Sequence, residues 1–130
     1  MYISHWISHN VTYLKKIHAL HHEHSKQFNN VSLYYISIWE SLFFGTLLTL
    51  LAILFNMNIY CFISFLIFNW LYGVISHLNI ITNRSNILIF TTNFFHLKHH
   101  MLKNKNYGFY TVIWDKIFET EEKSNTKNIC

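Results

Sequence analysis

The clearest pattern along the chain is an apolar segment with a short polar interruption. Residues 41–83 contain no Asp, Glu, Lys or Arg, and the stretches 41–55 and 59–76 are apolar on all sides. A helix at a soluble surface keeps one polar face. At 1.5 Å per residue, each stretch forms a helix of about 23–26 Å. That is a short crossing of a hydrocarbon core of about 30 Å.

The residues between the two stretches favour a reversal of the chain. Asn56, Met57 and Asn58 separate the apolar runs, and asparagine is common in tight turns. We therefore predict an all-α integral membrane fold with a transmembrane helical hairpin over 41–55 and 59–76. The alternative is a buried helix pair in a soluble protein. A chain of 130 residues offers little other material to cover such a pair.

Composition and charge agree with a membrane protein of one domain. Hydrophobic residues make up 52% of the chain and charged residues 12%, against about 25% charged in soluble domains. This balance excludes a disordered chain. Basic residues flank both ends of the apolar segment: Lys15, Lys16, Lys26, Arg84, Lys98, Lys103 and Lys105. The positive-inside rule then places both flanks in the cytosol, at a bacterial inner membrane or the endoplasmic reticulum. Anionic lipid explains these charges, so we expect no nucleic-acid partner.

Ten histidines against six acidic residues are the unusual feature of the composition. Most fall at helical spacings that place side chains on one face of a helix. The three groups are His5 and His9; His18, His21 and His22; and His96, His99 and His100. Neutral imidazole is the commonest metal ligand in proteins. Eight ligands exceed the needs of one ion and favour two metals.

Two histidines lie outside these groups. His77 stands alone at the end of the second apolar stretch, and spacing leaves its role open. His24 fits no pattern and is interpreted as an ordinary exposed histidine.

The residue types leave the metal open, because imidazole suits Fe, Zn, Cu and Ni. A metalloprotease H-E-x-x-H motif would need histidine at position 26, where Lys26 stands. A zinc hydrolase at the membrane face is a weaker alternative, since Glu23 is the only carboxylate close to a triplet in sequence.

The order of the histidine motifs resembles the fatty acid hydroxylase/sterol desaturase superfamily. The motifs are SHWISH at 4–9, IHALHH at 17–22, SHLN at 76–79 and FHLKHH at 95–100. The segment NYGFYTVIWDKIFET at 106–120 resembles the closing signature of the superfamily. The chain departs from the superfamily pattern at three places. Trp6 stands in place of arginine, and Glu119 stands in place of glycine. Around Glu40 the superfamily often has the motif H-P-x-E, whereas Ser37 and Ile38 occupy its first two positions here.

The resemblance implies a domain over 1–120, followed by a disordered tail at 121–130. It implies a di-iron centre, with zinc as a substitute ion, held by His5, His9, His18, His21, His22, His77, His96, His99 and His100. Tyr107 and Asp115 would be structural residues that hold the C-terminal segment beneath the site.

The chemistry implied is O2-dependent hydroxylation or desaturation of a lipid C–H bond. Its substrate would be a fatty acyl chain, a sterol or a related lipid. Electrons would come from a reductase through a donor such as cytochrome b5 or ferredoxin. Members of the superfamily normally carry another membrane hairpin ahead of the first motif, whereas Met1 lies four residues before His5. The alternative is therefore a truncated, non-catalytic membrane protein that retains a structural metal site.

Overall fold

The computed structural model describes residues 1–24, 32–78 and 89–122. Its elements are α1 (Tyr2–Asn10), α2 (Thr12–His24), the 3-10 helix η1 (Ser32–Tyr34), α3 (Ile38–Leu54), α4 (Ile59–Ser76), α5 (Asn93–Leu102) and α6 (Ile113–Ile117). The described residues contain no β-strand. A single isolated bridge joins Phe90 to Thr111. The prediction of a helical protein is confirmed.

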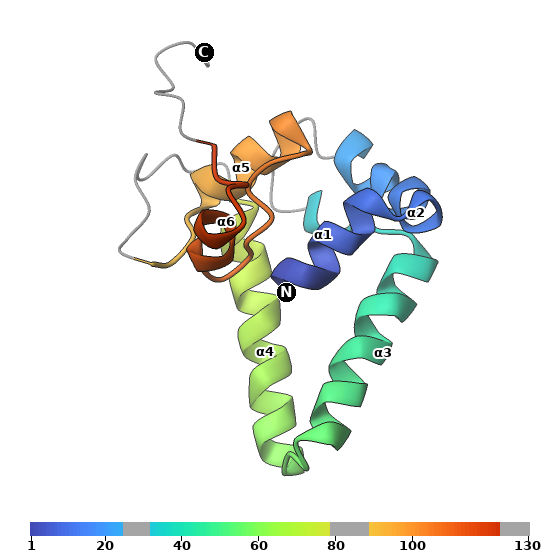
Figure 1. Cartoon of the computed structure of the whole chain (residues 1–130). Coiled ribbons are helices and arrows are strands. Elements are labelled where there is room, and N and C mark those ends of the chain that lie inside the picture. Colours follow the sequence, from blue (N-terminus) through green and yellow to red (C-terminus); the bar gives the residue numbers. More distant parts are fainter. Residues whose placement is uncertain (25–31, 79–88, 123–130) are drawn as a thin grey trace.

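The two apolar stretches form α3 and α4, which meet at a turn and diverge from it (Figure 1). Asn56 adopts a left-handed backbone with φ 46°, a conformation that asparagine tolerates better than most residues. Asn58 then caps α4, because its side chain accepts a hydrogen bond of 2.9 Å from the Tyr60 N–H. The reversal is therefore where the sequence predicts it.

The start of α3 lies earlier than predicted, at Ile38 instead of residue 41. Ser37 caps this helix, since its hydroxyl accepts a hydrogen bond of 3.1 Å from the Glu40 N–H. The capping bond lets the helix begin in a less apolar stretch, three residues before the uncharged segment.

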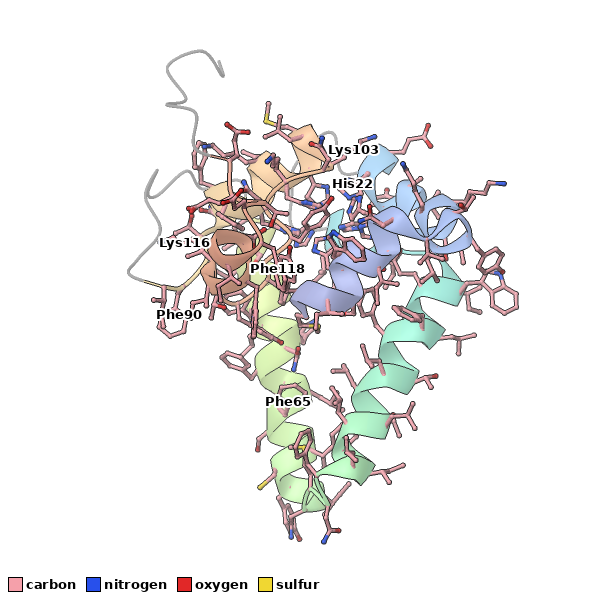
Figure 2. The ribbon with its side chains drawn as sticks, viewed as in Figure 1. His22, Phe65, Phe90, Lys103, Lys116 and Phe118 are labelled. Carbon is pink, nitrogen blue, oxygen red and sulfur yellow. The ribbon has the colours of Figure 1, made fainter. Side chains whose placement is uncertain are left out.

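The apolar side chains of α3 and α4 point mainly outwards, as the sticks along both helices show (Figure 2). Ile53, Leu54 and Tyr60 are 70%, 74% and 77% exposed. The alternative of a buried soluble helix pair does not agree with this exposure. Among the described helices, α4 alone is long and apolar enough to cross a membrane, because α3 has 17 residues.

The buried core lies at the far ends of α3 and α4, where α1, α2, α5 and α6 gather (Figure 1). Buried hydrophobic residues are few in the described chain: Tyr2, Phe94, Phe95, Tyr107 and Val112. Eight histidines are buried there: His5, His18, His21, His22, His77, His96, His99 and His100. Imidazole rings thus occupy the place that aliphatic side chains fill in most domains.

The C-terminal segment is fastened to this core by the carboxylate of Asp115, which is fully buried. This carboxylate accepts hydrogen bonds from the backbone N–H groups of Tyr107 and Gly108, at 2.7 and 2.6 Å, and from the Thr120 hydroxyl at 2.8 Å. A Cβ atom on Gly108 would lie 2.5 Å from Asp115 Oδ2, so only glycine fits there. The structural role expected of Asp115 is confirmed.

The prediction of a disordered tail falls largely on 123–130, outside the described residues. Glu121 and Glu122 are held by backbone hydrogen bonds, from Glu121 N–H to the Asp115 carbonyl at 3.2 Å and from Glu122 N–H to Asn106 Oδ1 at 2.8 Å.

We predict that Asp115→Asn destabilises the fold by about 2–4 kcal/mol, because the new amide cannot accept from both backbone donors and leaves a buried N–H unpaired. Thermal unfolding of the detergent-solubilised protein, followed by circular dichroism, measures the change. The exposed Glu119 provides the control Glu119→Gln, for which we expect an unchanged melting temperature. Equal melting temperatures for Asp115→Asn and the natural sequence would contradict this role.

Candidate metal centre

Four helices bring the predicted histidines to one place. α1 carries His5 and His9, α2 carries His18, His21 and His22, and α5 carries His96, His99 and His100; His77 is the C-terminal cap of α4. α1 packs against α2, and α4 packs against α5. His22 lies in the space between α2 and α5, where the side-chain nitrogens gather (Figure 2).

The nine histidines form two groups, in each of which the potential ligand atoms lie within 4.8 Å of one another. The five-histidine group is His5, His9, His18, His22 and His99. The four-histidine group is His21, His77, His96 and His100. Both groups draw on several helices, so each forms only when the helices have packed.

The five-histidine group is centred on the Nε2 atom of His22. This atom lies 3.1 Å from Nε2 of His18, 3.2 Å from that of His9 and 3.2 Å from that of His99. The Nε2 atoms of His9 and His99 are 3.0 Å apart. An imidazole nitrogen has one proton or one lone pair, and cannot form three hydrogen bonds at once.

The four-histidine group has the same character. His96 Nε2 lies 3.3 Å from His77 Nε2 and 3.1 Å from His100 Nε2. The His21 and His100 rings stand 4.7 Å apart between centroids. His77 therefore belongs to the site, although spacing alone left its role open.

Hydrogen bonds at the opposite ring nitrogen determine which way several imidazoles face. Nδ1 of His5 donates to the Tyr107 carbonyl at 2.9 Å, that of His99 to the Lys105 carbonyl at 2.8 Å, and that of His77 to the Gly73 carbonyl at 2.8 Å. A carbonyl only accepts, so Nδ1 carries the proton in these rings. Their Nε2 lone pairs then point into the two groups.

Lone pairs held this close repel one another unless a cation lies between them. Metal–nitrogen bonds of about 2.0–2.1 Å place neighbouring ligand nitrogens about 3.0–3.4 Å apart. The observed spacings of 3.0–3.3 Å match that range. Outer hydrogen bonds to carbonyls are also what metal-binding histidines commonly make. The donor set thus fits two metal ions, one in each group.

The protonation state of the rings agrees with this role. Burial, and then the charges of neighbouring histidines, lower the pKa of His9 and His21 to about 3 and that of His22 to about 2. Burial likewise lowers the pKa of His99 well below its ordinary value. The rings of these four histidines are therefore neutral at physiological pH, which is the state that binds metals.

Glu40 is a functional candidate that the sequence analysis missed. It is 5% exposed, and its Oε1 lies 2.5 Å from Nδ1 of His18. The two residues are 22 positions apart, and S-x-x-E at 37–40 is also an ordinary helix-capping pattern, so nothing in the spacing marks this contact.

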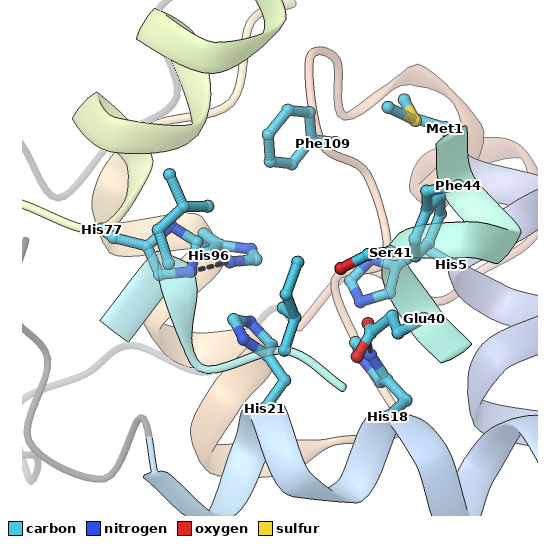
Figure 3. Close-up of a pocket in the computed structure, with 12 residues that line it drawn as sticks. Met1, His5, His18, His21, Glu40, Ser41, Phe44, His77, His96 and Phe109 are labelled. Atoms are coloured by element: carbon cyan, nitrogen blue, oxygen red, sulfur yellow. Dashed lines mark hydrogen bonds and ion pairs between the residues drawn. The ribbon is translucent and has the colours of Figure 1, made fainter. Parts of the chain in front are cut away.

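Two pockets reach the histidines from different elements. The first has a volume of about 200 Å³ and is lined by histidines of both groups together with Leu33, Ile36, Phe44 and Phe109 (Figure 3). The second, of about 260 Å³, reaches His9 and His22 and has Lys15 and Lys103 among its lining residues. The wall of the first pocket is almost wholly apolar, whereas that of the second is more polar and includes two lysines.

Comparison with known families identifies the chain. Residues 1–120 match the family model described as fatty acid hydroxylase. The chain belongs to the fatty acid hydroxylase family. A search of curated proteins and a search of solved structures found no match.

Membership of the fatty acid hydroxylase family confirms the predicted superfamily. The match spans all four histidine motifs and the closing segment. Ligation by the nine histidines stays a prediction, which their convergence supports. His24 ends α2, and its side chain lies outside the described part of the structure.

We predict that the metal-free chain loses stability as the pH falls below about 6.5. The unfolded chain binds protons on His9 and His21 below that pH, whereas the folded chain keeps these two rings neutral down to about 3, because burial lowers their pKa. The free energy of unfolding is then fully present above pH 6.5 and falls steadily towards pH 3. Denaturant titrations from pH 8 to pH 4 measure it, and a flat profile between pH 7 and pH 5 would contradict the buried neutral rings.

Proposed function

We propose that this fatty acid hydroxylase family member is a membrane di-iron oxygenase that hydroxylates or desaturates a lipid C–H bond. The observation that supports the proposal is the convergence of nine histidines into two adjacent groups beside an apolar pocket. Two iron ions would supply O2 activation and the oxidising power for breaking the C–H bond. Zinc would occupy the same donors without that redox chemistry.

The residues of the chain hold and shield the centre. The five-histidine group would bind one ion and the four-histidine group the other. The Tyr107, Lys105 and Gly73 carbonyls orient the rings of His5, His99 and His77 before a metal arrives. Burial of nearly every ring excludes bulk water, which would otherwise compete for the reacting groups.

The apolar pocket suits a hydrocarbon chain. Leu33, Ile36, Phe44 and Phe109 offer it no charge, and His21 and His96 stand at its wall (Figure 3). A lipid chain in this pocket would lie against both histidine groups. The C–H bond to be oxidised would then be placed mainly by apolar contacts, although Glu40, Ser41 and the histidines also line the pocket.

The exposed apolar faces of α3 and α4 support a location in the membrane. α4 would span the bilayer, and α3, with 17 residues, would span it with local thinning. The histidine-bearing helices and the loop after α5 carry basic residues, namely Lys15, Lys98 and Lys103. By the positive-inside rule, these charges favour a cytosolic location for this part of the chain. The centre would then lie at the inner surface of a bacterial membrane or of the endoplasmic reticulum.

Electrons would reach the centre through the second pocket. Its lining includes Lys15 and Lys103, and His9 and His22 lie at its wall. Two cations beside the five-histidine group favour an acidic donor such as cytochrome b5 or ferredoxin, reduced by its own reductase. A negatively charged donor surface would be steered to this pocket and away from the apolar one.

We predict that cells producing the chain with a reductase and its donor protein accumulate an oxidised lipid, and that His99→Gln abolishes it. Mass spectrometry of total lipids detects a gain of one oxygen or a loss of two hydrogens. The natural sequence without O2 is the control for oxygenase chemistry. A lipid cleaved by addition of water, and formed equally without O2, would favour a hydrolase. A natural chain that binds metal but changes no lipid would favour the non-catalytic alternative.

A second prediction concerns the pocket wall. Ser41→Phe places a ring in a pocket of about 200 Å³ and should reduce lipid oxidation at least tenfold while leaving the metal content unchanged. The matched control is Thr49→Phe on the same helix: Thr49 is exposed, is absent from this pocket, and resembles Ser41 in donating its hydroxyl four residues back. Equal oxidation by the two variants would place the lipid elsewhere.

A further inference from the structure

The two histidine groups differ in what holds the outer nitrogens of their rings. His5, His99 and His77 donate from Nδ1 to neutral backbone carbonyls. His18, in the five-histidine group, instead meets the carboxylate of Glu40 at 2.5 Å. Figure 3 shows the carboxylate of Glu40 beside the ring of His18. Nε2 of the same ring lies 3.1 Å from Nε2 of His22, so the ring stands between the carboxylate and the five-histidine group.

The carboxylate of Glu40 has few partners in the described chain. The residue is 5% exposed, and its Oε2 forms no hydrogen bond within the described chain. Over residues 1–24, 32–78 and 89–122, its carboxylate pairs with His18 and with no lysine or arginine. On the side of α3 and η1, the pocket that Glu40 lines has the apolar side chains of Leu33, Ile36 and Phe44, with Ser41 as a polar neighbour.

A buried carboxylate is costly unless positive charge lies close to it. Within the described chain, the ring of His18 supplies one hydrogen bond to this carboxylate, and Oε2 has no partner. A cation bound at Nε2 of the same ring would supply the missing charge through the ring, and would strengthen the Nδ1–H···Oε1 bond in return. Glu40 and an ion in the five-histidine group should therefore stabilise one another, whereas the four-histidine group has no such contact with Glu40 among the bonds described.

We propose that Glu40 is a positioning residue that acts through His18 to tighten metal binding in the five-histidine group and makes the two metal positions unequal. The inference rests on the proposed di-metal centre and adds a difference in metal affinity between its two positions. The hydrogen bond from the Glu40 N–H to the Ser37 hydroxyl fixes Glu40 in the first turn of α3. The side chain of Glu40 thereby links α3 to His18.

Metal titration of the full chain in lipid nanodiscs tests this inference, with Co²⁺ as the probe and a competing chelator to set the free concentration. The natural sequence should bind two ions per chain. Glu40→Gln keeps the size of the side chain and removes the charge, and should weaken one ion about ten- to a hundredfold while leaving the other unchanged. The Co²⁺ absorption bands of the weakened site should shift as well.

The matched control is Glu23→Gln. Glu23 is exposed and adjacent in sequence to His22. Its replacement by Gln therefore removes the same charge near the same histidine group, at a side chain for which no contact to an imidazole ring is described. Both affinities should equal those of the natural sequence. Melting temperatures provide a second readout: Glu40→Gln should leave the metal-free chain as stable as before or more stable, and should reduce only the gain in melting temperature on adding Co²⁺.

Several results would overturn the inference. Equal losses of stability with and without Co²⁺, at unchanged affinities, would make Glu40 a purely structural residue of α3. Equal weakening of both ions would remove the asymmetry. If Glu40→Gln does not fold, Glu40→Asp takes its place, and natural affinity for both ions in that variant would show that the 2.5 Å contact is not needed. A natural chain that binds no Co²⁺ would instead defeat the metal centre itself.

Discussion

The mutual repulsion of buried, neutral imidazoles is the constraint on which this structure depends. Nitrogen lone pairs at 3.0–3.3 Å are unfavourable neighbours, and the core around them has few aliphatic side chains to offset the cost. A cation in each group would convert that repulsion into coordination. The residues that form the core and the residues that would perform the chemistry are thus largely the same, so stability and metal occupancy are coupled.

The apolar pocket and the lysine-lined pocket reach the histidines between different sets of helices. α3 and α4 diverge from their turn, and the apolar pocket lies near their far ends, against α1 and α2. The lysine-lined pocket reaches the five-histidine group between α1, α2 and the loop after α5. A lipid and a charged electron donor would therefore approach by separate routes. In the proposed enzyme, that separation would keep the hydrocarbon away from water while the donor stayed in it.

Sequence periodicity predicted the histidine faces well, because i, i+3 and i+4 positions of one helix always share a side. The division into five and four could not be predicted in this way. His21 and His22 are neighbours on α2, but His22 meets histidines of α1 and α5, whereas His21 meets His77 at the end of α4 and histidines of α5. Glu40 was missed because its partner is distant in sequence. The early start of α3 was missed because apolarity was given more weight than the capping signature at Ser37.

The loop that follows α5 has a consequence for the order of assembly. His5 lies near the beginning of the chain, yet its ring is oriented by the carbonyl of Tyr107, and His99 is oriented by that of Lys105. A nascent chain emerging from the ribosome therefore cannot complete the five-histidine group until more than a hundred residues have been synthesised. In the proposed metal centre, the five-histidine group would therefore take up its ion only after the segment that contains Lys105 and Tyr107 has been made.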